Sequence, residues 1–289
     1  MKHTDPLIAW RQPSRRMLPF VGIALACCLC GCMENTVVIE LNKDGSGTIV
    51  TRTFLSENML ETMARARDGA PPLGEPRVPL NREACEQRAA KMGQGVRLLN
   101  VEPVARPSDG ARGVKVVYEF DDITAVELPV EPEQPEGTRL DPLRGRTRAD
   151  PIAFRYTPGD VGHLLVIQPF AASAGAEEAS KHREATPSAE ETNALRKAAR
   201  GMRFRMVVKV KGHIVSTNAS SVHTRKGDAA PSYITIFDLN FEELLSNEAA
   251  TKQMSTISRT ENVSKAMTRF RELPGIMLEP EQWVEVAFR

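Results

Sequence analysis

An apolar segment near the N-terminus decides which part of this 289-residue chain can fold as a water-soluble body. The segment covers residues 17–31 and follows three arginines, at positions 11, 15 and 16. It is 15 residues long, whereas a helix that spans a bilayer needs about 20 apolar residues. A short apolar run behind basic residues is typical of a secretory signal peptide, whose basic end stays in the cytoplasm. We therefore expect residues 1–31 to be a leader.

The end of the apolar segment resembles the lipobox of bacterial lipoproteins. Leu29-Cys30-Gly31-Cys32 places a leucine three residues before a cysteine and a small residue directly before it. Cys30 departs from the usual Ala or Ser but is similarly small. The resemblance implies cleavage between Gly31 and Cys32 by signal peptidase II. It also implies diacylglycerol on the Cys32 thiol and often a further acyl chain, such as palmitate, on the new amine. Two or more acyl chains anchor a protein stably because each buried methylene contributes about 0.8 kcal/mol.

The compartment follows from the same leader. We expect an extracytoplasmic protein of the cell envelope or periplasm that is joined to a membrane through its N-terminal lipid. In a Gram-negative host, Met33 after the cysteine favours the outer membrane, since it is not the Asp associated with inner-membrane retention. An ordinary cleaved signal and an uncleaved N-terminal anchor are the alternatives.

Cysteines and charges restrict the chemistry of the exported part. Four of the five cysteines lie between residues 27 and 32, so only Cys85 would stay a free thiol after cleavage and lipidation. The clustered cysteines have no Cys or His partners at zinc-finger spacing, and we expect no metal and no cofactor. The leader holds four basic residues and one acidic residue, so its removal changes the net charge from +1 to −2. That balance argues against a nucleic-acid partner.

Strands and helices interleave along the mature chain, and most neighbouring strands are separated by turn residues. We expect strands at Thr36–Leu41, Ile49–Leu55, Val96–Val104, Val114–Phe120, Ile152–Tyr156, His163–Gln168, 203–211, Ile214–Ala219, Tyr233–Leu239 and Trp283–Phe288. We expect helices at Ser56–Ala66, Asn81–Gly93, Glu190–Ala199, Phe241–Leu245 and Val263–Leu273. This order predicts an α+β fold, with an antiparallel sheet and helices packed on one face.

Composition suggests a division of the mature chain. Residues 171–190 are rich in Ala, Glu and Ser and are predicted to be a linker. It would separate an N-terminal α+β domain or half at 32–170 from a C-terminal half at 191–289. The two halves show a weak internal sequence similarity, because Val116–Phe120 and Val284–Phe288 have similar alternating sequences. Two similar halves are therefore an additional possibility.

The turn after the first strand partly matches a calcium-binding loop. Asn42, Asp44 and Ser46 place oxygen-bearing side chains at alternate positions before Gly47. Thr53 stands where such a loop has a bidentate glutamate, and the entering segment is a predicted strand instead of a helix. These departures favour an ordinary hairpin turn.

No catalytic constellation is evident, and we expect no enzyme. The chain has no G-x-S-x-G, no phosphate-binding glycine motif and no H-E-x-x-H. A rival hypothesis is an envelope hydrolase or metal-dependent enzyme that uses His213 and His223 with Asp228 or Asp238. The basic positions Arg203, Arg205, Lys209 and Lys211 favour a solvated strand face, with anionic lipid headgroups as the alternative partner.

The start of the mature part also resembles the LppM-like bacterial lipoproteins, whose domains begin with a strand–Asp-Gly–strand hairpin right after the lipidated cysteine. Here the resemblance rests on residues 36–55 and on the later alternating strands. It implies a lipid-binding or envelope role and supplies no catalytic residues. We therefore expect a lipid-anchored binding or envelope-structural protein, with an envelope protein or a lipid as ligand. A carrier of an apolar ligand is the further alternative.

Overall fold

The computed structural model describes residues 33–57, 60, 81–129, 150–168, 193, 196, 201–224, 232–253 and 268–289. The leader, Cys32 and the predicted linker at 171–190 lie outside these residues. So do most of the helices expected at Ser56–Ala66, Glu190–Ala199 and Val263–Leu273. No helix in the part of the chain that the structure describes is long and apolar enough to cross a bilayer.

A long hairpin forms the centre of the larger of two sheets. Strands β1 (Met33–Leu41) and β2 (Gly47–Leu55) pair antiparallel over their whole length, from Met33 opposite Leu55 to Leu41 opposite Gly47. The turn between them has its Gly45 at φ +91°, a conformation that glycine adopts without a steric penalty. Asp44 accepts hydrogen bonds from the Ser46 amide and hydroxyl, at 3.0 and 2.7 Å. The predicted hairpin is therefore confirmed.

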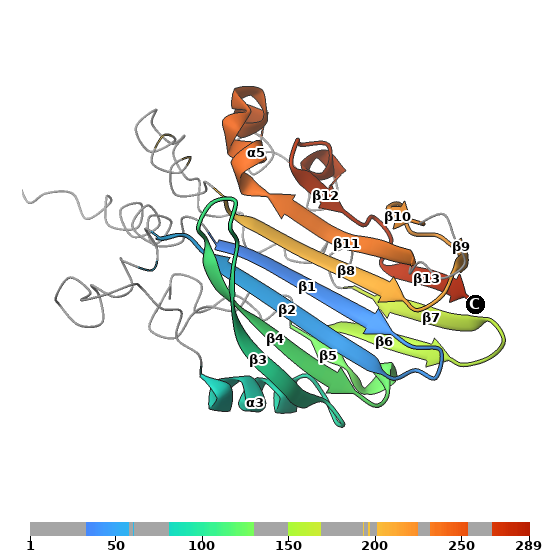
Figure 1. The fold of residues 1–289 in the computed structure, drawn as a ribbon. Helices are drawn as coiled ribbons and strands as arrows, with labels where there is room; N and C mark the ends of the chain where they lie inside the picture. The colour runs from blue at the N-terminus through green and yellow to red at the C-terminus, as the bar shows by residue number, and fades with distance from the viewer. Residues whose placement is uncertain are drawn as a thin grey trace, which may run out of the picture.

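The large sheet extends the hairpin on both sides (Figure 1), in the order β10-β11-β8-β1-β2-β4-β3, with β12 paired to β11. The added strands are β3 (Arg97–Ala105), β4 (Arg112–Phe120), β8 (Arg203–Val210), β10 (Val222–His223), β11 (Ser232–Asn240) and β12 (Ile276–Leu278). One pair is parallel: β8 runs alongside β1, with Glu34 opposite Arg203 and Leu41 opposite Val210. The expected antiparallel sheet therefore contains one parallel pair.

A second, smaller sheet has the order β5-β6-β7-β13-β9, and all its pairs are antiparallel. Its strands are β5 (Glu127–Leu128), β6 (Ile152–Thr157), β7 (Gly162–Ile167), β9 (Ile214–Thr217) and β13 (Trp283–Phe288). The 3-10 turn η1 (Ile123–Ala125) leads into β5. Strands from both sides of residues 171–190 are neighbours in each sheet, so the two predicted halves interleave.

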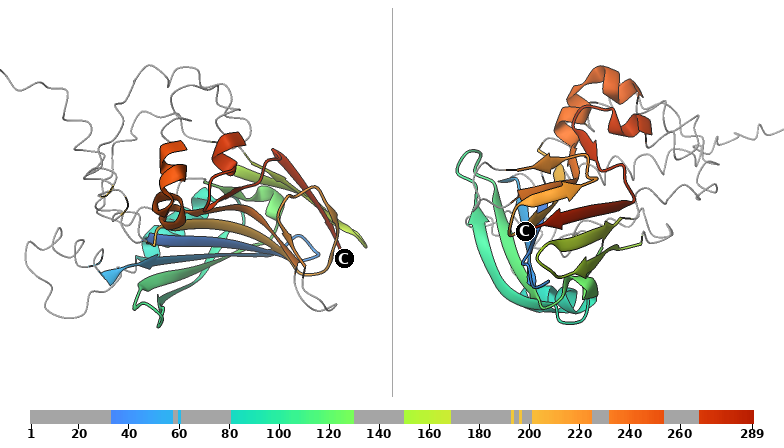
Figure 2. Two further views of the ribbon diagram at one scale, coloured as in Figure 1. Left: turned by 90° about the horizontal axis from the view of Figure 1, so that it is seen from above. Right: turned by 90° about the vertical axis from the view of Figure 1, so that its right-hand side faces the viewer.

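The small sheet and the helices cover the same side of the large sheet (Figure 2). Helix α3 (Arg82–Lys91) contributes Ala89 to the core, and α5 (Phe241–Ser246) contributes Leu244. Asn81 caps α3 by accepting a hydrogen bond from the Ala84 amide at 3.0 Å. Strands outnumber helices among the described elements, so the α+β expectation holds in a broad sense, with the helices on one face as predicted.

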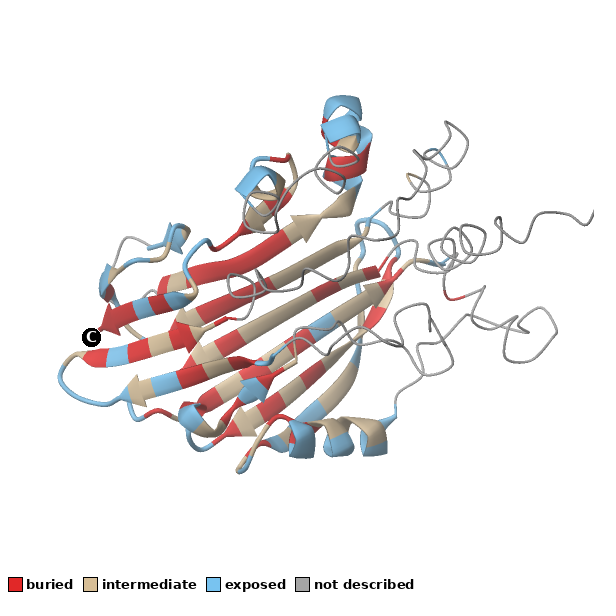
Figure 3. Ribbon diagram, turned by 180° about the vertical axis from the view of Figure 1, so that it is seen from behind, coloured by how far each residue is buried: buried red, intermediate tan, exposed pale blue. Residues whose placement is uncertain are grey.

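One apolar cluster fills the space between the layers. Ile39, Tyr118 and Val208 from the large sheet meet Leu164 and Val286 from the small one. Burial alternates along the strands (Figure 3), as expected where one side of a strand faces a core. In β8 the alternating pattern predicts one buried face, and Met206, Val208 and Val210 of that face are buried, whereas Phe204 is only half-buried. Val207, which the pattern places on the solvated face, is buried as well.

Candidate functional site

The start of β1 is the part of the fold nearest to the predicted lipidation site. Cys32 is bonded directly to Met33, which is the first residue of β1 and is buried. Met33, Leu55 and Leu60 form a small apolar cluster of their own, with Phe204 packed against it. The strand is held from its first residues, since Met33 lies opposite Leu55 and Glu34 opposite Arg203.

The β3–β4 turn lies beside this end of β1. The Arg106 guanidinium contacts the Glu34 carboxylate and also donates to Asp109 inside the turn, with Nη2 at 2.6 Å from Oδ2. The same guanidinium lies over the Phe54 ring, 5.0 Å from its centroid. These contacts hold the pKa of Arg106 above its ordinary value and the pKa of Asp109 below its own, chiefly through their mutual hydrogen bonds. We call Glu34 and residues 105–112, together with the last residues of β2 and the first residues of β8, the anchor end.

The opposite end of the two sheets is closed by backbone and ring contacts. Lys211 donates its amide to Leu41 at 2.9 Å, and His213 exchanges backbone hydrogen bonds with the C-terminal Arg289 at 2.9 and 3.0 Å. The Tyr156 hydroxyl donates to the Lys43 carbonyl at 2.7 Å. Its ring stacks on Phe288 at a centroid distance of 6.0 Å. We call this region, which includes the β1–β2 and β6–β7 turns, the far end.

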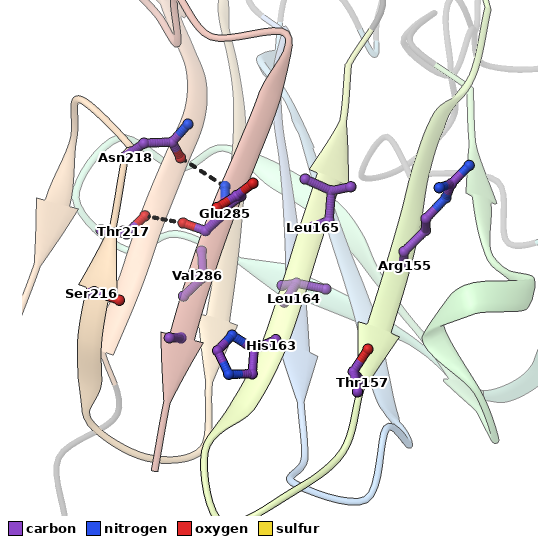
Figure 4. A pocket seen from close by; sticks show the side chains of 11 residues that line it. Arg155, Thr157, His163, Leu164, Leu165, Ser216, Thr217, Asn218, Glu285 and Val286 are labelled. Carbon is purple, nitrogen blue, oxygen red and sulfur yellow. Dashed lines mark hydrogen bonds between the residues drawn. The ribbon is translucent and has the colours of Figure 1, made fainter.

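A depression of about 650 Å³ lies on the outer side of the small sheet (Figure 4). Four strands contribute its lining, which consists of Arg155, Thr157, His163, Leu164, Leu165, Ser216, Thr217, Asn218, Glu285, Val286 and Ala287. The strand register places Leu165 between Arg155 on β6 and Glu285 on β13. The next row toward the far end holds Thr157, His163, Ala287 and Ser216. Leu165 is thus flanked by a cation on one side and an anion on the other.

Two polar groups of the depression hold its wall together. The Asn218 side chain accepts from the Glu285 amide at 2.7 Å and donates to the Trp283 carbonyl at 2.9 Å. The Thr217 hydroxyl donates to the Glu285 carbonyl at 2.5 Å. These bonds continue the β13 ladder past the end of β9. Arg155, His163 and Glu285 are exposed and remain available to a binding partner.

The histidines of the rival enzyme hypothesis are not brought together with acids. His213 lies at the far end, while His223 lies on β10 and stacks on the Tyr233 ring at 4.5 Å. Asp238 is bound to Arg203, and Asp228 falls outside the described residues. Within the described ranges, no group of three or more His, Cys, Asp or Glu side chains could hold a metal ion. The depression contains His163, which the sequence did not single out as functional.

The basic positions of β8 are neutralised by neighbouring strands. Asp238 Oδ2 lies 2.6 Å from Arg203 Nη2 and 3.5 Å from Arg205 Nε. Lys209 Nζ lies 2.7 Å from Glu40 Oε1. The hydrogen bond to Asp238 raises the pKa of Arg203. This row is therefore a ladder of cross-strand ion pairs, which weakens the alternative that it meets anionic headgroups.

Cys85 lies on the side of α3 that faces the core. It is half-buried and packs against the main apolar cluster, near Tyr118 and Arg88. Burial raises the pKa of the Tyr118 hydroxyl and lowers the pKa of the Arg88 guanidinium. A thiol in such surroundings has a packing role.

The architecture is a two-sheet β structure with helices on one side, an anchor end and an open depression. No family model and no curated protein matches the chain. Among solved structures, it is similar to the folded domain of LppM from Mycobacterium tuberculosis, determined by NMR. The alignment covers 71% of this chain and 89% of that one, at 9% sequence identity and a TM-score of 0.26. A TM-score this low defines neither a shared fold nor a shared function.

Proposed function

We propose that the chain is an exported lipoprotein, held on a membrane by acyl chains on Cys32, whose two-sheet body is a binding or structural component of the cell envelope. The observation that carries the proposal is the position of Leu29-Cys30-Gly31-Cys32 directly before β1. Cleavage before Cys32 leaves every residue of β1 in place. Cleavage a few residues later would remove part of a strand that is paired on both sides.

Binding is favoured over catalysis by the chemistry of the depression. Its exposed groups are a guanidinium, an imidazole and a carboxylate around leucine, and no pair of them is hydrogen-bonded as a nucleophile and base would be. Such a surface suits a partner that has both charges and apolar groups, such as an envelope polypeptide. The depression is open to solvent, so it is not the enclosed apolar chamber that the carrier alternative requires.

The anchor is tested by mass spectrometry of the membrane-bound protein. Trypsin would release residues 32–43 as the N-terminal peptide of the mature chain. We expect this peptide to begin at Cys32 and to carry the mass of diacylglycerol, with or without a third acyl chain. Peptides that contain residues before Cys32 in the membrane-bound pool would count against the proposal.

A pair of cysteine variants completes the test. Cys32→Ser should retain the leader, lack the acyl mass and change its sedimentation with membranes. Cys85→Ser is the matched control, because it removes a thiol without touching the lipobox, and it should behave as the wild type does. Identical size and sedimentation of Cys32→Ser and the wild type would contradict the proposal.

A further inference from the structure

The absence of a spacer between Cys32 and the fold has a geometric consequence. Adjacent Cα atoms are about 3.8 Å apart, and Met33 is already paired and buried. The acyl chains of a lipidated Cys32 would therefore attach to a rigid point of the large sheet. Lipoproteins with a flexible spacer could rotate over the membrane, whereas this body has little freedom to do so.

We propose that the anchor end rests against the lipid headgroups, so that the far end and the depression face the aqueous compartment. This inference rests on the proposed lipidation of Cys32. The partner is the headgroup layer of the bilayer that holds the acyl chains, because the glycerol unit on Cys32 must itself lie at that depth.

The contacts of Glu34 decide which surfaces lie beside the lipid. Arg106 contacts Glu34, which is two residues after Cys32, so the β3–β4 turn lies next to the attachment point. The start of β8 also lies beside this point, since Arg203 is opposite Glu34. The charges here are internally paired, Arg106 with Glu34 and Asp109, and Arg203 with Asp238. The surface therefore needs no anionic lipid, and the covalent chains supply the attachment.

The direction of β1 places the far end away from the bilayer. Nine residues of strand extend over about 26 Å at roughly 3.3 Å per residue. The β1–β2 turn follows at the other end and binds Tyr156, next to the β6–β7 turn. The row of the depression with Thr157 and His163 is adjacent to that turn. A partner in solution could thus reach the depression without contacting the membrane.

Fluorescence quenching by lipid tests this orientation. The lipidated protein carries Cys85→Ala, and one cysteine is introduced at Ser108 in the β3–β4 turn or at Asp160 in the β6–β7 turn, both of which are exposed. Each variant is labelled with a fluorophore and reconstituted into phosphatidylcholine vesicles that contain a headgroup nitroxide lipid. We expect the label at Ser108→Cys to lose most of its fluorescence and the label at Asp160→Cys to be unchanged. Equal quenching, or stronger quenching at Asp160→Cys, would overturn the orientation.

Two controls separate the orientation from the anchor. Flotation of the labelled protein with the vesicles reports lipidation alone. Protein that fails to float would refute the anchor. Protein that floats but shows no difference in quenching between the two labels would refute only the orientation. A flexible Gly-Ser insert of about ten residues between Cys32 and Met33, with a span of about 17 Å, should remove the difference between the two labels. If the insert leaves the difference intact, rigid attachment is not its cause.

Hydrogen exchange of the unlabelled, lipidated protein gives the same answer where a cysteine variant does not fold. Amides of residues 105–112 should exchange more slowly on vesicles than in the unlipidated Cys32→Ser protein, whereas amides of residues 42–46 should not change. Uniform exchange in the two turns would overturn the proposal.

Discussion

Tyr156 connects three parts of the molecule through a single side chain. Its hydroxyl binds the β1–β2 turn in the large sheet, while its ring lies on β6 and stacks on Phe288 of β13. A methyl group added to the α-carbon of Gly45 or Gly162 would lie within 3.1 Å of this side chain, so both glycines are needed for it to fit. The residue therefore holds the far end of the two sheets together.

Replacement of Tyr156 by Phe should cost about 1 kcal/mol of unfolding free energy, since it removes one hydrogen bond and keeps the ring stacking. Tyr156→Ala should cost about 2 kcal/mol, because it also removes the half-buried ring that packs against the core. Urea denaturation at neutral pH measures both. Equal losses in the two variants would show that the hydroxyl, and not the ring, supplies the contact.

The same residue gives a stability change at alkaline pH. Burial, with a smaller effect from Asp44, raises the pKa of the Tyr156 hydroxyl above its ordinary value, which is about 10. The unfolded chain therefore loses this proton first as the pH rises, and the contribution of the neutral hydroxyl is complete below about pH 10 and declines above it. The stability difference between the wild type and Tyr156→Phe should shrink over the pH range above about 10. A difference that is constant over this range would contradict the assignment.

Residues of the depression show what sequence reasoning misses at this scale. Arg155, His163 and Glu285 occupy alternate positions of amphipathic strands, where charged residues are ordinarily just solvated. The spacing of these three residues in the sequence does not predict that β6, β7 and β13 are neighbouring strands. The sequence likewise does not predict that Asn218 lines the depression, because its hydrogen-bond partners lie more than 60 residues later in the chain.

Among the elements, edge strand β3 of the large sheet has two features that disfavour pairing with a strand of another molecule. Strand β3 is the last in the order of the sheet, and its register shifts between Leu98 and Asn100, which leaves Leu99 53% exposed. Pro103 within β3 has no amide hydrogen to offer to another strand. A bulge and a proline are two of the devices by which natural edge strands avoid association.

Substitution of Pro103 by Val should therefore promote association between molecules, since it restores an amide donor and raises β propensity. Pro103→Lys is the matched variant, because it restores the same donor but adds a charge that opposes edge pairing. Light scattering at increasing protein concentration should rise for Pro103→Val and stay near the wild-type level for Pro103→Lys. No increase for Pro103→Val would indicate that the bulge alone protects the edge.

The elements themselves were predictable where their signals are local. The three hairpins, β1–β2, β3–β4 and β6–β7, follow from turn residues between alternating segments, and the Asn81 cap begins α3 where expected. The parallel pairing of β1 with β8 was not predictable, because about 160 residues separate the two strands and parallel strands need no tight turn that would mark them in the sequence. The small sheet was not predicted as a separate layer because its central pair joins β7 to β13, which lies more than 100 residues later in the chain.

At the scale of the whole molecule, Glu279 ties the two sheets together near the end of β7. The side chain is 1% exposed and accepts from the Ser220 amide at 2.7 Å and from its hydroxyl at 2.9 Å. Its backbone amide donates to Ile236 on β11, and its carbonyl accepts from the Gln168 side chain at 3.0 Å. One residue thus joins the large sheet, the small sheet and the segment between β9 and β10.

Removal of this carboxylate should lower the unfolding free energy by about 2–3 kcal/mol in Glu279→Ala, because the Ser220 amide loses its acceptor. Glu279→Gln keeps an acceptor of the same shape, so its unfolding free energy should fall by less than that of Glu279→Ala. Glu279→Ala combined with Ser220→Ala should cost less than the sum of the single changes, since the two residues contact each other. Denaturant melts of the wild type, the two single alanine variants and the double variant measure this coupling, and strict additivity would show that the hydrogen bond from the Ser220 hydroxyl contributes nothing.

The place of β13 in the small sheet bears on the order of events during synthesis. This strand ends one residue before the C-terminus and lies between β7 and β9, with Val284 and Phe288 fully buried. The small sheet cannot close before β13 has been synthesised, because this strand joins β7 to β9. On the proposed route of export, β7 and β9 would stay apart until the segment that holds β13 has also left the translocase.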